Sequence, residues 1–257
     1  MTSQQFQIFT AFRNEFCSYC MTLNKAYKDV LKPLQIAARL SDTPDYPLET
    51  PVVYNTALDE VTEESDIRLI VIGDNPGKTE QREKMKRYLT GQSGKIAEGF
   101  FTRNAEFNTD FRKNAIILNK TPIHTAKTIH LKYLSKNGGL EIRKIISESQ
   151  LFMAEKTAKL HQDLCAAART SGGIAPELWL VGYAELKENG IFGEYKSCLH
   201  SSYKKMDEDW QRVYVFQHFS MNRFLIDLKN FMGKHKELGI IEAAHELGTI
   251  HKKEIFA

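Results

Sequence analysis

The sequence has few cysteines and tryptophans, little net charge and no long apolar run, so it lacks the features that mark disulfide-rich, strongly basic or membrane-spanning proteins. Its 257 residues include 4 cysteines and 2 tryptophans, and 35 Lys and Arg against 32 Asp and Glu leave a net charge of only +3. A balance so close to neutral demands no nucleic-acid or membrane partner, so any basic surface must be local. No apolar run approaches the roughly 20 residues of a membrane-spanning helix. The stretch MTSQQFQIFTAFRNEF lacks the basic and then apolar segments of a signal peptide. We therefore expect a cytoplasmic protein without a membrane partner.

The four cysteines do not form a metal-binding pattern. Cys17 and Cys20 are one helical turn apart, but Cys165 and Cys198 are isolated from them and from each other. A structural zinc or iron–sulfur site would need a second close pair of ligands. We predict four reduced thiols, no metal and no cofactor.

The composition that is present, 42% hydrophobic and 26% charged residues, is typical of a globular domain with a sizeable core. Residues 3–38 are predicted to be helical because large apolar side chains recur at helical spacing, with Ser3 as a plausible N-cap and Pro33 marking an end or a kink. A second helix is predicted over 140–170, stopped by Gly172 and Gly173.

Four short apolar runs predict buried strands. They are rich in β-branched and aromatic residues, and helix-like segments separate them: IRLIVI (67–72), AIILN (115–119), LWLVG (178–182) and VYVFQ (213–217). Strands that alternate with helices predict a parallel sheet with helices on both faces. Because ligands of such sheets bind at the carboxyl ends of the strands, that edge is where a site is expected.

Polar residues follow each predicted strand. The four segments are Gly73-Asp74-Asn75-Pro76-Gly77, Asn119-Lys120-Thr121-Pro122-Ile123-His124, Gly182-Tyr183-Ala184-Glu185 and His218-Phe219-Ser220-Met221-Asn222-Arg223. Any one of them alone is as often a structural turn, and a lone histidine after a strand is more often structural than catalytic. Their occurrence together, at one edge of the sheet, predicts a binding or catalytic site.

In this order the motifs resemble the uracil-DNA glycosylase superfamily. GDNPG (73–77), the segment TGQSG (90–94), a strand ending in Asn119, LVGYAEL (180–186) and HFS (218–220) correspond to its motifs, nearest the single-strand-selective and mismatch-specific branches. The resemblance covers residues 65–230. It implies a DNA partner and a metal-independent enzyme that flips a damaged base and hydrolyses its bond to the sugar.

The resemblance also implies residue roles. Asn75 would position the attacking water, His218 would donate a hydrogen bond to the leaving base, and the amide of Asn119 would read the base edge. Met221 and Arg223 lie where the family inserts a wedge into DNA. A further set would approach the DNA phosphates: Gly77, Gly91, Ser93, Gly94 and Ser220.

Three points depart from the family pattern. The segment TGQSG lacks the phenylalanine that stacks on the flipped base, so Tyr88, Phe100 or Phe101 would have to supply the ring, although all three are equally typical of helix-core aromatics. Asp74 accompanies Asn75, and it is either a general base or the N-cap of a helix after Pro76. The usual proline of the last motif is replaced by Phe219.

We predict a three-layer α/β/α fold with a central four-stranded parallel sheet. A helical extension (1–45) precedes the glycosylase-like domain (46–235), and a carboxy-terminal helix (236–257) follows it; we expect a monomer. Two alternatives stay open. One is a glycosylase-fold protein without glycosylase activity that binds DNA or a nucleotide-like ligand. The other is a small-molecule enzyme in which the GDNPG turn holds a phosphate at a helix N-terminus, although the chain has no G-x-G-x-x-G or P-loop sequence.

Overall fold

The computed structural model describes residues 1–40, 42–203 and 208–257, and its centre is a parallel sheet. The strands are β1 (Leu69–Gly73), β2 (Ala115–Asn119), β3 (Glu177–Val181) and β4 (Val213–Phe216). All neighbours are parallel, in the order β2-β1-β3-β4. The four predicted strands are therefore confirmed, each within two residues of its expected bounds, as is the three-layer fold.

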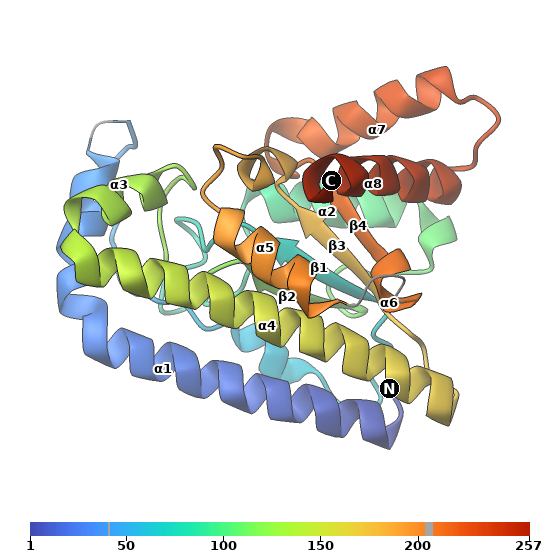
Figure 1. The fold of residues 1–257 in the computed structure, drawn as a ribbon, viewed down its shortest axis with the longest axis horizontal. Helices are drawn as coiled ribbons and strands as arrows, with labels where there is room; N and C mark the ends of the chain where they lie inside the picture. The colour runs from blue at the N-terminus through green and yellow to red at the C-terminus, as the bar shows by residue number, and fades with distance from the viewer. Residues whose placement is uncertain (41, 204–207) are drawn as a thin grey trace.

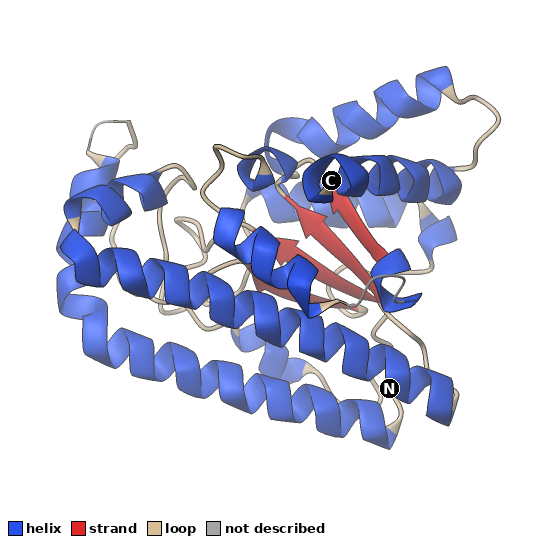
Figure 2. Ribbon diagram, in the orientation of Figure 1, coloured by secondary structure: helices blue, strands red, loops and turns tan. Residues whose placement is uncertain are grey.

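Eight α-helices and several short 3₁₀ turns of the described residues surround the sheet in two layers (Figures 1 and 2). Helices α4 (Gly139–Ser171) and α5 (Gly193–Ser202) cover one face, and α1 (Ser3–Arg39) packs along α4. The other face is covered by α2 (Gln92–Arg103), α7 (Arg223–Lys234) and α8 (Ile240–Phe256). The short α3 (His130–Asn137) and α6 (Glu208–Gln211) complete the fold.

The two long helices predicted from the sequence are present, and their ends lie close to the predicted positions. Thr2, and not Ser3, caps α1: its hydroxyl accepts from the backbone N–H of Gln5, and the side chain of Gln5 accepts from the N–H of Thr2. Pro33 lies inside α1 and does not end it. Gly172 ends α4 in the left-handed conformation, with φ 75°, which is the usual role of glycine at that place.

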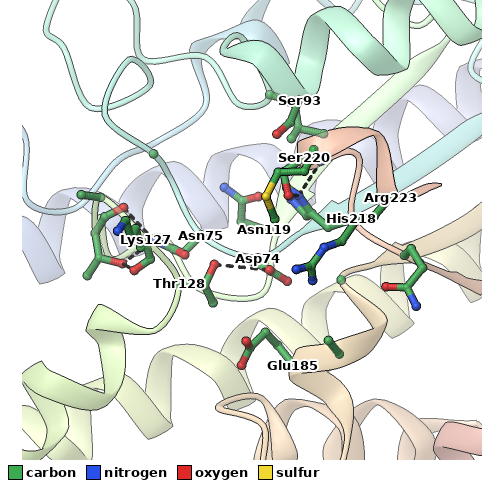
Figure 3. A pocket seen from close by; sticks show the side chains of 18 of the residues that line it. Asp74, Asn75, Ser93, Asn119, Lys127, Thr128, Glu185, His218, Ser220 and Arg223 are labelled. Atoms are coloured by element: carbon green, nitrogen blue, oxygen red, sulfur yellow. Dashed lines mark hydrogen bonds between the residues drawn. The ribbon is translucent and has the colours of Figure 1, made fainter. Parts of the chain in front are cut away.

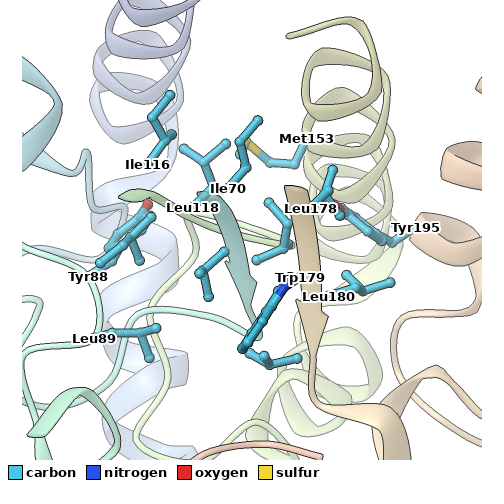
Figure 4. Close-up of a cluster of buried hydrophobic side chains, with 14 of the residues drawn as sticks. Ile70, Tyr88, Leu89, Ile116, Leu118, Met153, Leu178, Trp179, Leu180 and Tyr195 are labelled. Carbon is cyan, nitrogen blue, oxygen red and sulfur yellow. The ribbon is translucent and has the colours of Figure 1, made fainter. Parts of the chain in front are cut away.

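Side chains of both sheet faces join one hydrophobic cluster. Successive strand residues point to opposite faces, so Leu178 and Leu180 face away from Trp179. Figure 4 shows Met153 of α4 and Tyr195 of α5 among the strand side chains. Trp179 is 1% exposed and contacts aromatic rings of α2, β4 and α7: Phe101, Phe216 and Phe224. Continuous burial on both faces explains why the strands read as apolar runs without alternation.

The amino-terminal helix is part of the same packing. Phe9 and Phe16 are fully buried in the common cluster, and the rings of Tyr19 and Phe152 stack at 3.8 Å. No helix in the described part of the chain combines the length and the apolar character needed to cross a bilayer.

The parallel register brings the carboxyl ends of three strands to one edge. Gly73 of β1 lies directly opposite Asn119 of β2, and β3 runs alongside β1. A side chain at position 73 would overlap with the Asn119 carboxamide, so a glycine is required there. The predicted polar segments therefore begin next to one another.

Candidate functional site

A cavity of about 460 Å³ opens at the carboxyl edge of the sheet (Figure 3). The chain segments after all four strands contribute to its wall. It brings together most of the residues that the sequence predicts for the site: Asp74, Asn75, Gly77, Ser93, Asn119, His218, Ser220, Met221 and Arg223. Residues more than 140 positions apart in the chain thus share one cavity, as the sheet-edge argument predicts.

Asn75 is held with an amide oxygen that accepts no hydrogen bond from the described residues. Its side-chain N–H₂ donates to the hydroxyl of Thr125 at 2.9 Å and lies 3.4 Å from the carbonyl of the same residue. Thr125 is fixed in turn, because its hydroxyl donates to the backbone carbonyl of Lys127 at 2.8 Å. Since both amide protons have protein acceptors, the carbonyl oxygen of Asn75 is left to accept from a ligand or a water in the cavity.

His218 presents a proton donor to the cavity. The backbone N–H of Ser220 donates to Nδ1 at 3.1 Å, so Nδ1 is unprotonated, and the Ser220 hydroxyl lies 2.8 Å from the same nitrogen. Removal from water lowers the pKa of His218, and the charges of Lys120 and Arg223 lower it further, while Asp74 opposes them. The histidine is therefore neutral at pH 7, with its proton on Nε2.

The turn that follows β4 is anchored by an aromatic side chain. Phe219 is fully buried and packs against the rings of Phe111 and Phe224 at 6.2 and 5.0 Å. Beyond it Met221 and Asn222 adopt left-handed φ values of 53° and 57°, and Met221 is 68% exposed. The buried ring of Phe219 thus fixes this turn, and Met221 projects at the cavity rim.

Asn119 offers an unpaired donor. Its side chain is 1% exposed, lines the cavity, and its amide nitrogen has no hydrogen-bond partner among the described residues. A buried amide without a partner costs free energy, on the order of 1–3 kcal/mol. A ligand carbonyl that accepts from Asn119 would recover that cost, so the residue is suited to recognise an acceptor.

The structure places all three candidate stacking rings elsewhere. Tyr88 is 1% exposed and donates its hydroxyl to the carbonyl of Val53 at 2.5 Å. Phe100 and Phe101 are 2% and 3% exposed and pack against each other and against further rings of the core. None of the three lines the cavity, so the suggestion that one of them stacks on a ligand is wrong. Among the described residues, the cavity wall has no Phe, Tyr or Trp; Leu89 supplies an aliphatic surface.

Asp74 does not cap a helix. Its Oδ1 accepts from the ammonium group of Lys120 at 2.6 Å, and its Oδ2 accepts from the hydroxyl of Thr128 at 3.3 Å. The segment after Gly77 is a series of turns, and the next α-helix begins only at Gln92. The N-cap reading is therefore wrong, and so is the expectation of a helix directly after GDNPG.

Two of the predicted glycines serve the backbone and do not line the cavity. Gly91 precedes α2 as its N-cap residue, and Gly94 lies in the first turn of that helix. A side chain at position 94 would overlap with the backbone carbonyl of Leu89. Gly94 thus lets α2 approach the cavity wall closely, which is a structural use of the motif.

Sequence reasoning missed Glu80. This side chain is 8% exposed, lines the cavity and accepts from the backbone N–H of Gly77 at 3.1 Å; it also bonds the backbone amides of Leu89 and Thr90. Burial raises its pKa to about 7, against the lowering effect of those amides. Glu80 therefore ties the GDNPG turn to the segment that carries Leu89. Nothing in the sequence around it distinguishes it from the neighbouring surface glutamates.

Residues at the end of α1 and beyond brace the same wall from behind. His124 is fully buried; its Nδ1 donates to the carbonyl of Pro76 at 2.8 Å, and its Nε2 accepts from the Tyr46 hydroxyl at 2.8 Å. Gln35 donates to the carbonyl of His124 at 2.8 Å. Asp42 contacts both Lys127 and the ring of His130 at 2.9 Å. The amino-terminal segment thus supports the turn that carries Asn75.

The cysteines remain apart from the cavity. All four are free, and Cys20 is buried with its sulfur near the carbonyl of Val53 at 3.9 Å. Burial raises the pKa of its thiol. Within 1–40, 42–203 and 208–257, no group of three His, Cys, Asp or Glu side chains is placed to hold a metal ion.

Comparisons of the chain with protein-family models, with curated proteins and with solved structures found no match. The residues of the cavity are therefore the basis for inferring a function.

Proposed function

We propose that the protein is a DNA glycosylase that hydrolyses the N-glycosidic bond of uracil or a related damaged base in DNA. The observation that supports this most is the meeting of Asn75, Asn119 and His218 in one cavity. In each of them, the atom that the reaction needs makes no hydrogen bond to a described residue. The residue roles come from the superfamily resemblance, and the geometry is compatible with them.

The reaction would proceed by hydrolysis at the sugar carbon. A water held by the carbonyl of Asn75 attacks C1′, the C1′–N bond breaks, and its electron pair leaves with the base. Asp74 takes a proton from the water. The developing charge on the base carbonyl accepts a hydrogen bond from Nε2–H of His218, and the base is finally protonated by solvent. The amide N–H₂ of Asn119 donates to a base carbonyl.

The rim has features that suit DNA. Met221 projects beside the cavity with Arg223 next to it, an apolar wedge and a cation of the kind that separates bases and contacts phosphates. Ser93 and Ser220 add hydroxyl groups at the same edge (Figure 3). A flipped base would lie against Leu89 in place of an aromatic ring.

The alternative of a phosphate held at a helix N-terminus after GDNPG has lost its structural basis, because no helix begins there. The alternative of a DNA or nucleotide binder without glycosylase activity retains one supporting observation, the absence of a Phe, Tyr or Trp ring from the described cavity wall. Stacking contributes roughly 1–3 kcal/mol per base where it occurs, so its loss weakens the capture of a flipped base.

The test is release of uracil from single- and double-stranded oligonucleotides. We expect activity in the wild type and a loss of about 10²-fold or more in Asn75→Ala and in His218→Ala. Matched controls are Asn14→Ala on the exposed side of α1 and His235→Ala at the end of α7, which line no part of the cavity and should keep full activity.

Two outcomes would count against the proposal. Equal losses in the controls would show that the substitutions act through folding. A wild type that binds DNA in a salt-dependent way but releases no base would favour the binder without glycosylase activity.

A further inference from the structure

A buried cation lies directly behind the cavity. Lys120, the residue after β2, is 0% exposed, and its ammonium group donates to Asp74 Oδ1 at 2.6 Å and to the carbonyl of Val181 at 2.5 Å. The carbonyl of Gly73 lies 3.4 Å away. The three protons of the ammonium group thus have acceptors from the ends of β1 and β3. The ring of Phe192 lies 5.0 Å from the nitrogen and closes the site on another side.

The surroundings of Asp74 hold the carboxylate in one orientation. Gly182, at the end of β3, has φ 98°, and a side chain there would overlap with Asp74 Oδ1. Thr128 donates to the second oxygen, and Asp74 itself lines the cavity. Residues from three strand ends and one loop therefore combine to aim a single carboxylate at the ligand space.

Burying the Lys120–Asp74 ion pair costs free energy, so the stability of the fold alone does not explain it. Taking a lysine and an aspartate out of water costs several kcal/mol per ion, and apolar residues of the same volume often serve a fold as well or better. Burial lowers the pKa of Lys120, and the charge of Asp74 opposes that effect. A carboxyl group that is 8% exposed would, without a nearby cation, be driven toward its neutral form.

We propose that Lys120 is a positioning residue of this site, which keeps Asp74 ionised and directed into the cavity. In the ionised form Asp74 can accept a proton from the attacking water, so Lys120 acts on the reaction through Asp74 and never touches the substrate. The chemical part of this inference rests on the proposed glycosylase function; the charge state of Asp74 does not.

The first test reads the charge of Asp74 without any reaction. Carboxyl carbons of aspartate are labelled with ¹³C, the signal of Asp74 is assigned by its loss in Asp74→Asn, and its titration is followed by NMR in the wild type and in Lys120→Met. We expect Asp74 to stay protonated to a higher pH in the variant than in the wild type, because the buried carboxylate loses its neighbouring cation. Lys120→Gln, which keeps a donor without the charge, serves as a second variant if Lys120→Met does not fold. An unchanged midpoint overturns the inference.

The second test measures base release in a double-mutant cycle. We expect Lys120→Met to reduce kcat at least tenfold at pH 7, with KM little changed and the acid limb of the pH–rate profile moved to higher pH. In an Asp74→Asn background the same substitution should cost less than threefold. Full additivity of the two losses overturns the inference in an active protein. A wild type that releases no base refutes the proposed function, and the NMR titration then still decides the role of Lys120.

Discussion

Two buried groups give the stability of this protein opposite dependences on pH. Burial lowers the pKa of His124 from its ordinary 6.5 to about 4, and burial raises that of Glu80 from 4.5 to about 7. Both side chains brace the cavity wall. The perturbations that separate their effects are His124→Gln and Glu80→Gln, because glutamine can still donate and accept hydrogen bonds at either place but does not titrate.

The signs follow from which state of the chain binds more protons. For His124 the unfolded chain does, so its contribution to stability is complete above pH 6.5 and is lost as the pH falls through about 4. For Glu80 the folded protein does, so its contribution is complete below pH 4.5 and is lost as the pH rises through about 7. Each difference spans about 2.5 pH units, which corresponds to about 3 kcal/mol. In the wild type the two largely cancel between pH 4.5 and 6.5.

The assay is urea unfolding at half-unit steps from pH 4.5 to 6.5. Without His124 the free energy of unfolding should fall as the pH rises, and without Glu80 it should increase. Other titrating groups are common to both variants, so the difference between the two isolates the pair, and it should change by up to about 5 kcal/mol over the window. Parallel curves for the two variants would refute the reasoning.

Three further substitutions have outcomes that follow from the contacts. Gly182→Ala places a side chain at φ 98° and against Asp74, so we expect a loss of about 1–3 kcal/mol in urea unfolding together with a loss of base release. Tyr46→Phe leaves Nε2 of His124 without a partner and should cost about 1–3 kcal/mol, with a fall in kcat if the brace positions the catalytic turn. Trp179→Ala removes the ring that contacts α2, β4 and α7 and should cost about 3–5 kcal/mol, measured by circular dichroism.

The fold could be predicted because its signals are local. A buried parallel strand needs an apolar run of about five residues, and the run 115–119 corresponds to β2 without adjustment. The helix expected after Pro76 failed because polar, helix-compatible residues do not fix a helix by themselves. In the segment after Gly77, the buried carboxylate of Glu80 accepts hydrogen bonds from three backbone amides, and these bonds stabilise a series of turns in place of a helix.

Only those site residues that a local sequence pattern marks could be predicted. Asn75, Asn119 and His218 stand at strand ends, and the sheet rule alone brings them together. Lys120, the partner of Asp74, is 46 residues away in the chain. The burial of Lys120 depends on the packing of three strand ends, so no local sequence pattern predicts it. The prediction that Tyr88 or Phe100 stacks on a ligand failed for the same reason. The sequence around an aromatic residue of the core does not differ from that around an aromatic residue of a cavity wall.

The bracing of the cavity wall by the amino-terminal segment links ligand binding to the integrity of α1. Gln35, Asp42 and Tyr46 contact the loop and the turn that hold Asn75 and Thr125, so a chain in which this segment has detached also loses the shape of the cavity. By mass action, a ligand that binds only the closed form then suppresses detachment, and amide hydrogens at the end of α1 should exchange more slowly when the cavity is filled. Amide exchange at the end of α1 would thereby measure whether the cavity is occupied, although no residue of α1 lines it.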